Sequence, residues 1–192
     1  MTRRALAALA AAALTAGALT GCGGESWEDR CTTSATGFIE CAGDDRPPPA
    51  ELRGELLDGR MWKLSDVAGK VVVVNFWGSW CNPCRAEADD LEQTYQATKG
   101  QRVEFVGVNH NDDRDAARAF ERTRATYPSL FDPASKVALQ FKVTPNTTPV
   151  TMVLDRAGRI AAVKRAAVTA AELRPVVERI AAEPIPAEPV GN

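Results

Sequence analysis

Two cysteines separated by two residues are the part of this sequence best suited to redox chemistry. They lie in the segment Trp80-Cys81-Asn82-Pro83-Cys84, which follows a run of β-branched and aromatic residues. This spacing lets two sulfurs meet across one helical turn, so that a disulfide forms with modest strain. At the N-terminus of such a helix, Cys81 would be the attacking thiolate and Cys84 the resolving thiol. The pattern predicts a thiol–disulfide oxidoreductase with Cys81 and Cys84 as catalytic residues.

Two elements must position these cysteines. Residues Val71–Trp77 are apolar almost throughout, as expected for a central strand that is covered on both faces. The helix that follows is predicted from Asn82 to Thr98, because small or apolar residues recur on one face and Lys99-Gly100 is a typical ending. Pro83 suits the first turn, where a backbone N–H would have no helical partner.

The other predicted elements complete an α/β domain. A hairpin around Asp58-Gly59 precedes the central strand, and the next buried strand is Val103–Asn109. Residues 114–126 follow as a helix, and 150–163 form a second hairpin before a last helix. Strands alternating with helices imply parallel neighbours, whereas a hairpin implies antiparallel ones. We therefore expect a mixed sheet with helices on both faces and an N-terminal β-hairpin.

Two metal-dependent interpretations of the cysteine pair fit less well. A zinc site needs about four ligands, and the sequence adds only His110 and the pair Cys31 and Cys41. Covalent haem attachment needs a histidine directly after the second cysteine, and Arg85 stands there. We therefore expect no metal and no cofactor. His110 is expected in a loop, without a catalytic role.

The N-terminal segment is typical of an export signal. Arg3 and Arg4 precede an apolar stretch over residues 5–19 that is too short for a transmembrane helix, and Leu19-Thr20-Gly21-Cys22 follows. That ending resembles the bacterial lipobox, in which the cysteine carries a lipid and becomes the mature N-terminus. The prediction is a signal peptide over 1–21 and lipidation at Cys22; the alternative is a secreted protein in which Cys22 is incidental.

Composition of the mature chain bears on its partners and its tether. Removing residues 1–21 takes two arginines and no acids from 23 basic and 25 acidic residues, which leaves a net charge of −4 and no reason to expect nucleic-acid binding. Cys31 and Cys41 are expected to bridge outside the cytoplasm, either as a structural staple or as a second redox pair. We predict a tether over 22–50, a folded domain over 51–182 and a disordered tail over 183–192.

Several motifs together resemble one family of thioredoxin-fold proteins. Lys70–Trp80 leads into a W-C-x-P-C motif, and Glu87 lies three residues past Cys84. Gly107–Asp113 opens a helical insertion, and Thr148-Pro149 precedes a strand. Over residues 51–182 this is similar to the membrane-tethered TlpA/ResA-like family, which includes the CcmG type. The resemblance implies a thioredoxin fold in which Pro149, rather than Pro145, is the cis-proline that faces the dithiol.

The resemblance also suggests roles for residues around the dithiol. Asn75 stands where thioredoxin has a buried aspartate, so Glu87 is the better candidate for a proton acceptor in exchange. The alternative for Glu87 is a carboxylate that merely complements the helix dipole. Trp80, Thr148 and Pro149 would bind substrate.

The family's activity sets the expected function. The resemblance implies a membrane-anchored, extracytoplasmic reductant of protein disulfides, including apocytochrome c in cytochrome c maturation, that is recharged by a membrane electron donor. The alternatives are a disulfide-forming oxidase in protein folding and a binding lipoprotein with an idle dithiol.

Overall fold

The computed structural model describes residues 26–48 and 51–184. The predicted signal peptide, the predicted lipidation site Cys22 and residues 185–192 of the predicted tail lie outside this range. Within the described residues, no helix combines the length and the apolar character needed to span a bilayer.

The elements follow one another in the order expected for an α/β domain, with two extra strands at the start. The strands are β1 (Thr32–Thr33), β2 (Ile39–Glu40), β3 (Arg53–Glu55), β4 (Met61–Lys63), β5 (Val71–Trp77), β6 (Val103–His110), β7 (Ser129–Asp132), β8 (Val150–Leu154) and β9 (Ile160–Lys164). The α-helices are α1 (Asn82–Thr98), α2 (Arg114–Arg124), α3 (Lys136–Gln140) and α4 (Ala170–Ala181). Short 3-10 helices are η1 (Trp27–Arg30), η2 (Gly43–Asp45), η3 (Leu64–Val67), η4 (Lys99–Gln101) and η5 (Pro145–Thr147).

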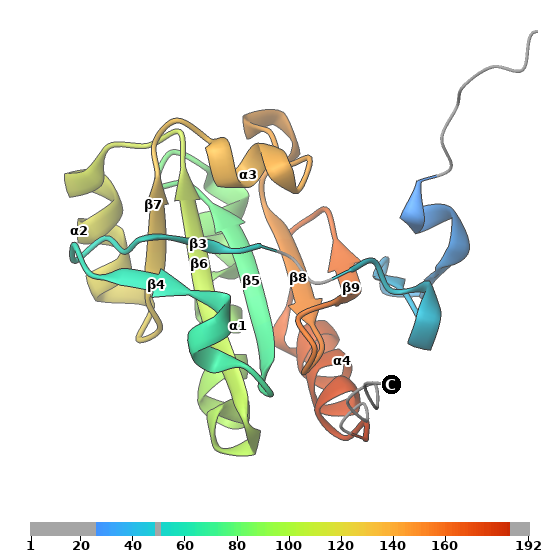
Figure 1. Ribbon diagram of the computed structural model, residues 1–192. Helices are drawn as coiled ribbons and strands as arrows, with labels where there is room; N and C mark the ends of the chain where they lie inside the picture. Colours follow the sequence, from blue (N-terminus) through green and yellow to red (C-terminus); the bar gives the residue numbers. More distant parts are fainter. Residues whose placement is uncertain (1–25, 49–50, 185–192) are drawn as a thin grey trace, which may run out of the picture.

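The main sheet is mixed, as predicted. In the described part of the chain, seven strands pair in the order β1-β2-β9-β8-β5-β6-β7 (Figure 1). Strand β5 is parallel to β6 and antiparallel to β8, and β8 is antiparallel to β9. Strand β5 is therefore central, and its C-terminal end lies between the end of β6 and the start of β8.

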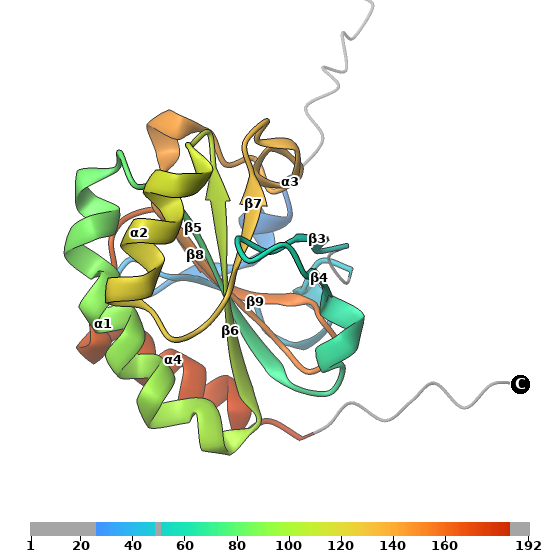
Figure 2. The same ribbon diagram turned by 90° about the vertical axis from the view of Figure 1, so that its left-hand side faces the viewer.

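Helices cover both faces of the sheet, which confirms the prediction. Helices α1, α2 and α4 lie on one side, while α3 and the separate β3–β4 hairpin lie on the other (Figure 2). The hairpin is joined to the sheet through a bridge between Leu56 and Leu130, next to β7. The predicted helical insertion after β6 is α2.

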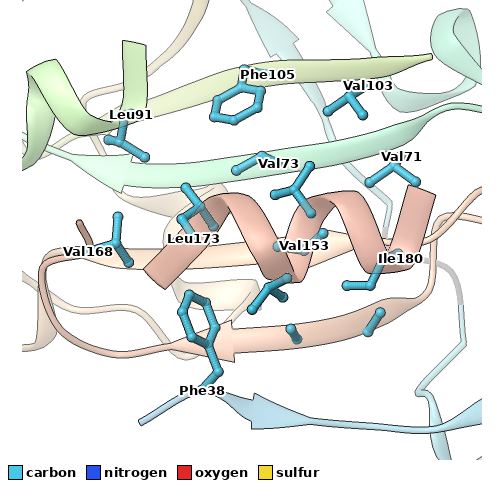
Figure 3. Packing of buried hydrophobic residues seen from close by; sticks show 14 of the residues in the cluster. Phe38, Val71, Val73, Leu91, Val103, Phe105, Val153, Val168, Leu173 and Ile180 are labelled. Carbon is cyan, nitrogen blue, oxygen red and sulfur yellow. The ribbon is translucent and has the colours of Figure 1, made fainter. Parts of the chain in front are cut away.

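Burial of β5 on both faces of the sheet explains why its sequence is almost continuously apolar. Val71 and Val73 belong to a cluster under α1 and α4, whereas Val72, Val74 and Phe76 belong to a cluster on the opposite face. Figure 3 shows the first cluster, with Leu173 and Ile180 of α4 packed over the sheet. Each fully buried side chain of this size stabilises the fold by roughly 1.5–3 kcal/mol.

The folded body begins before Glu51, the predicted start of the domain. Strand β2 pairs with β9 antiparallel, so part of the predicted tether is the border of the main sheet. Phe38, just before β2, is fully buried in the cluster under α4 (Figure 3). Backbone pairing and aromatic burial thus hold a segment that the sequence indicated as a spacer. At the other end, Glu183 of the predicted tail is bonded to Arg46.

Candidate active site

The two cysteines that the sequence predicts to be catalytic, Cys81 and Cys84, lie at the junction of β5 and α1. Cys81 is the N-cap residue of α1, and the backbone N–H of Cys84 donates a hydrogen bond to its sulfur over 3.2 Å. The two residues form a disulfide in the structure. The free N–H groups and dipole of a helix N-terminus favour negative charge on this sulfur once the disulfide is opened. Because Cys84 lies one turn inside the helix, the geometry fits Cys81 as attacking sulfur.

The turn before Cys81 is fixed to the end of β6 by a carboxylate. Asp112 accepts the backbone N–H of Ser79 over 2.6 Å and its hydroxyl over 2.8 Å. It also accepts the side-chain amide of Asn109 over 2.7 Å. The N-cap residue of α2 is Asp113, so Asp112 is left for this contact with the turn.

The loop before β8 faces the disulfide. The peptide bond between Thr148 and Pro149 is cis, which confirms the choice of Pro149 over Pro145. The carbonyl oxygen of Thr148 lies 3.9 Å from the sulfur of Cys81. A substrate chain that approached Cys81 would therefore meet this loop first. Trp80, which directly precedes Cys81, has 42% of its residue surface exposed and offers an apolar contact.

Glu87 is a buried carboxyl on the same face of α1 as Cys84. One oxygen accepts the amide N–H of Asn75 and the other the backbone N–H of Val168, both over 2.9 Å. Burial raises the pKa of Glu87 to about 7, and the two hydrogen bonds offset only part of that rise. Near neutral pH, the carboxyl is therefore divided between its protonated and ionised forms. That property suits a proton acceptor.

A small cavity lies beside Cys84 and Asn75, the residue that donates to Glu87. Its volume is about 20 Å³, and both Cys84 and Asn75 line it. This is enough for one water molecule, which needs roughly 10–15 Å³ and polar neighbours. Asn75 holds Glu87 through one amide N–H and donates to the hydroxyl of Thr151 over 3.1 Å. The asparagine that replaces thioredoxin's aspartate thus orients the carboxyl.

His110 is part of the site, against the expectation that it lies in a loop. It is the last residue of β6 and is fully buried. Its Nε2 lies 2.9 Å from the hydroxyl oxygen of Thr148, and its ring meets that of Trp80 edge-on at 6.1 Å between centroids. One histidine without a partner at a fixed spacing gives no sequence signal for such a position.

The structure does not bring the second cysteine pair to this site. Cys31 and Cys41 are bonded to each other. The backbone N–H of Cys41 donates to Ala161 at the start of β9. Strand β9 runs antiparallel to β8, whose start carries Pro149, so the two disulfides lie towards opposite ends of the sheet. The geometry fits a structural staple, and direct exchange between the pairs has no support.

Comparisons with known proteins agree with this geometry. The model of the AhpC/TSA family matches residues 44–163. The chain is 31% identical to the thiol-disulfide oxidoreductase ResA of Geobacillus thermodenitrificans over 125 residues, which cover 65% of this chain and 71% of the relative. It is 33% identical to ResA of Bacillus subtilis over 104 residues, which cover 54% of this chain and 57% of the relative.

Solved structures show the same fold. A DsbF homologue from Corynebacterium diphtheriae aligns with a TM-score of 0.69 and 39% identity, covering 74% of this chain and 92% of that one. A secreted thiol-disulfide isomerase from Corynebacterium glutamicum aligns with a TM-score of 0.72 and 32% identity, covering 76% and 92% respectively.

Proposed function

Because the chain belongs to the AhpC/TSA family and is a ResA-like thiol–disulfide oxidoreductase with a thioredoxin fold, we propose that it reduces protein disulfides outside the cytoplasm from a membrane anchor. The observation that carries this proposal is the position of Cys81, at the N-terminus of α1 and 3.9 Å from the carbonyl of Thr148. The substrates we propose include apocytochrome c before haem attachment.

The reaction begins with the reduced enzyme. The Cys81 thiolate attacks one sulfur of a substrate disulfide, which forms a mixed disulfide and releases one substrate thiolate. Cys84 then loses its proton to the Glu87 carboxylate and attacks the Cys81 sulfur. The mixed disulfide breaks, the second substrate thiolate leaves, and the Cys81–Cys84 disulfide remains. The substrate has gained two electrons from the enzyme. A membrane dithiol donor of the thioredoxin-reductant type then reduces the Cys81–Cys84 disulfide with two further electrons and is itself oxidised to a disulfide.

One feature supports reduction as the physiological direction. Asn82 and Pro83 place no cation between the cysteines, so the motif adds no charge to the helix N-terminus that would stabilise the thiolate as in a strong oxidant. The name of the ResA relatives, thiol-disulfide oxidoreductase, is compatible with either direction. The competing function is a disulfide-forming oxidase, and the two differ in the stability of the oxidised pair.

The reduction potential of Cys81–Cys84 tests the direction. The purified protein is equilibrated with glutathione and dithiothreitol buffers, and trapped thiols are counted. We expect a potential well below that of glutathione. A value near or above the glutathione potential would overturn the reductase and favour the oxidase. Cys81→Ser should abolish turnover, whereas a variant that retained turnover would overturn Cys81 as the attacking residue.

Membrane attachment is proposed to depend on a lipid at Cys22. Ser26, where the described chain begins, is four positions after Cys22, and four extended residues span at most about 14 Å. A lipid at Cys22 would therefore keep the folded body close to the bilayer surface. The expected result is that Cys22→Ala moves the protein from the membrane fraction to the soluble fraction, while the control Ser26→Ala stays with membranes. Unchanged fractionation of Cys22→Ala would contradict lipid anchoring.

A further inference from the structure

The chain's single histidine connects the cis-proline loop to the end of β6. His110 is fully buried, and each of its ring nitrogens has one hydroxyl neighbour. Nε2 lies 2.9 Å from Oγ1 of Thr148, and Nδ1 lies 3.2 Å from Oγ of Ser135. The ring thus joins the loop before β8 to the segment that enters α3, directly beneath the exposed Trp80.

The hydrogen-bond partners fix where the imidazole proton lies. Thr148 has one hydroxyl proton, and it donates that proton to the carbonyl of Thr144 over 2.8 Å. Toward His110 the same oxygen must therefore accept, so Nε2 carries the hydrogen. Burial lowers the pKa of His110, and the charges of Asp132 and Asp112 oppose this only in part. The neutral ring then leaves Nδ1 as acceptor for the hydroxyl of Ser135.

These hydrogen bonds hold a residue whose carbonyl oxygen contacts the reacting sulfur. The side chain of Thr148 is held from both sides, by His110 and by Thr144, while its carbonyl lies 3.9 Å from the Cys81 sulfur. We propose that His110 is a positioning residue, which donates Nε2–H to Thr148 and thereby holds the cis-proline loop against Cys81 for reaction with substrate disulfides. The proposal rests on the oxidoreductase function of this site and adds a residue that acts through Thr148.

A double-mutant cycle tests the proposal through reactivity. His110→Leu and Thr148→Val each remove one side of the bond, and His110→Gln keeps an N–H donor. The readouts are kcat and KM with a disulfide-bonded model peptide, and the rate of Cys81 alkylation by iodoacetamide. We expect each single variant to lose about tenfold in kcat/KM, as one lost positioning hydrogen bond would cause. The kcat/KM of the double variant should be no lower than that of the less active single variant. His110→Gln should keep most of the kcat/KM that His110→Leu loses.

A matched control separates positioning from stability. Thr94→Val removes a buried hydroxyl whose partner is the Asp90 carbonyl in the same helix, away from the dithiol. It should lower the free energy of unfolding without changing kcat/KM or the alkylation rate. If His110→Leu and Thr148→Val behave like this control, or if their effects on kcat/KM simply multiply in the double variant, the proposal is overturned.

The histidine resonance gives a test that does not depend on turnover. Because the chain has one histidine, its ring nitrogens are assigned without ambiguity in a long-range nitrogen–proton spectrum. We expect the neutral Nε2–H form at neutral pH in the wild-type protein and a changed pattern in Thr148→Val. The Nδ1–H form or a charged ring would overturn the proposal. Absence of turnover in the wild-type protein would instead overturn the proposed reductase function, while this spectrum still reports on the bond.

Discussion

At the scale of single residues, the site joins a sulfur at a helix N-terminus to a carboxyl that is kept from water. Only 2% of the residue surface of Glu87 is exposed to water. Asn75 and Val168 each donate one N–H to it, so each carboxyl oxygen accepts a hydrogen bond from the protein. The same burial that raises the pKa of this carboxyl to about 7 also makes its charge costly. Its ionisation should therefore affect both stability and rate, in opposite senses.

Glu87→Gln should remove a pH-dependent loss of stability. The pKa rises from 4.5 to about 7 on folding, so the folded protein holds this proton more tightly than the unfolded chain. The contribution of Glu87 to the free energy of unfolding is therefore complete below pH 4.5. It is lost as the pH rises through about 7, and the loss amounts to roughly 3 kcal/mol. Denaturant unfolding of the oxidised protein at pH 5 and 8 measures this. Between pH 5 and 8, the free energy of unfolding should fall by nearly that amount more in the wild type than in Glu87→Gln. An equal fall in both proteins would contradict the raised pKa of Glu87.

The same substitution should slow exchange at the step that needs a proton acceptor. Glutamine accepts no proton, so Cys84 would deprotonate without help, and general-base effects of this kind are on the order of 10²-fold or more. Single-turnover kinetics with a mixed disulfide at Cys81 measure the release of the second thiol. Asp89→Asn, on the exposed side of α1, is the control and should react like the wild type. An unchanged release rate in Glu87→Gln would leave this carboxyl with only a structural role.

At the scale of elements, the β1–β2 hairpin differs most from what the sequence indicated. Its strands are two residues long, and β2 is held by β9, which follows it by more than a hundred residues. Such a strand has no periodic pattern of its own, and the nearby prolines favour a spacer. By contrast, β5 and α1 have the predicted bounds, because an apolar run, Pro83 and Lys99-Gly100 encode them locally.

The site shows the same division between local and distant causes. Cys81, Cys84 and Pro149 follow from motifs that are contiguous in the sequence. The roles of Asn75, Asp112 and His110 depend on which residues the folded sheet brings beside them, namely Glu87, Ser79 and Thr148. No spacing rule in a single sequence encodes these pairs, so they became visible only with the structure.

Removing the Cys31–Cys41 bond should destabilise the fold and leave the redox site intact. The bond closes a loop of ten residues' separation, and the chain-entropy account gives roughly 2–3 kcal/mol for such a loop. Urea unfolding of the variant with Ser at both positions checks this value. Its Cys81–Cys84 reduction potential should match the wild type, since the two disulfides lie towards opposite ends of the sheet. A shifted potential would indicate that the pairs communicate.

At the scale of the whole molecule, one buried arginine joins three distant segments. Arg46 donates to the carbonyl of Cys41 and forms ion pairs with Asp155 over 3.0 Å and with Glu183 over 2.6 Å. Asp155 lies in the β8–β9 turn, and Glu183 follows α4. The side chains of Arg46 and Asp155 are nearly inaccessible to water. The N-terminal segment, the sheet and the end of the chain therefore meet at one guanidinium group.

Arg46→Ala should lower the free energy of unfolding more than most substitutions outside the hydrophobic core. Among the described residues it leaves the buried Asp155 with Arg159 as its one cationic partner, and losing one member of a buried pair costs about 3 kcal/mol or more. Arg53→Ala breaks an exposed pair with Glu51 and should cost under about 1 kcal/mol. Thermal and urea unfolding compare the two variants. Equal, small losses would show that the Arg46 ion pairs do not stabilise the fold.

The pairing of β2 with β9 also bears on self-association. An unpaired strand at the border of a sheet exposes backbone N–H and C=O groups that can template the strand of another molecule. Strand β9 is almost wholly apolar, and β2 covers the residues Ala162 and Val163 on its outer side. Reductants strong enough to open Cys31–Cys41 weaken the hairpin that provides this cover. Opening of the Cys31–Cys41 bond should therefore promote self-association of the molecule through the uncovered edge of β9.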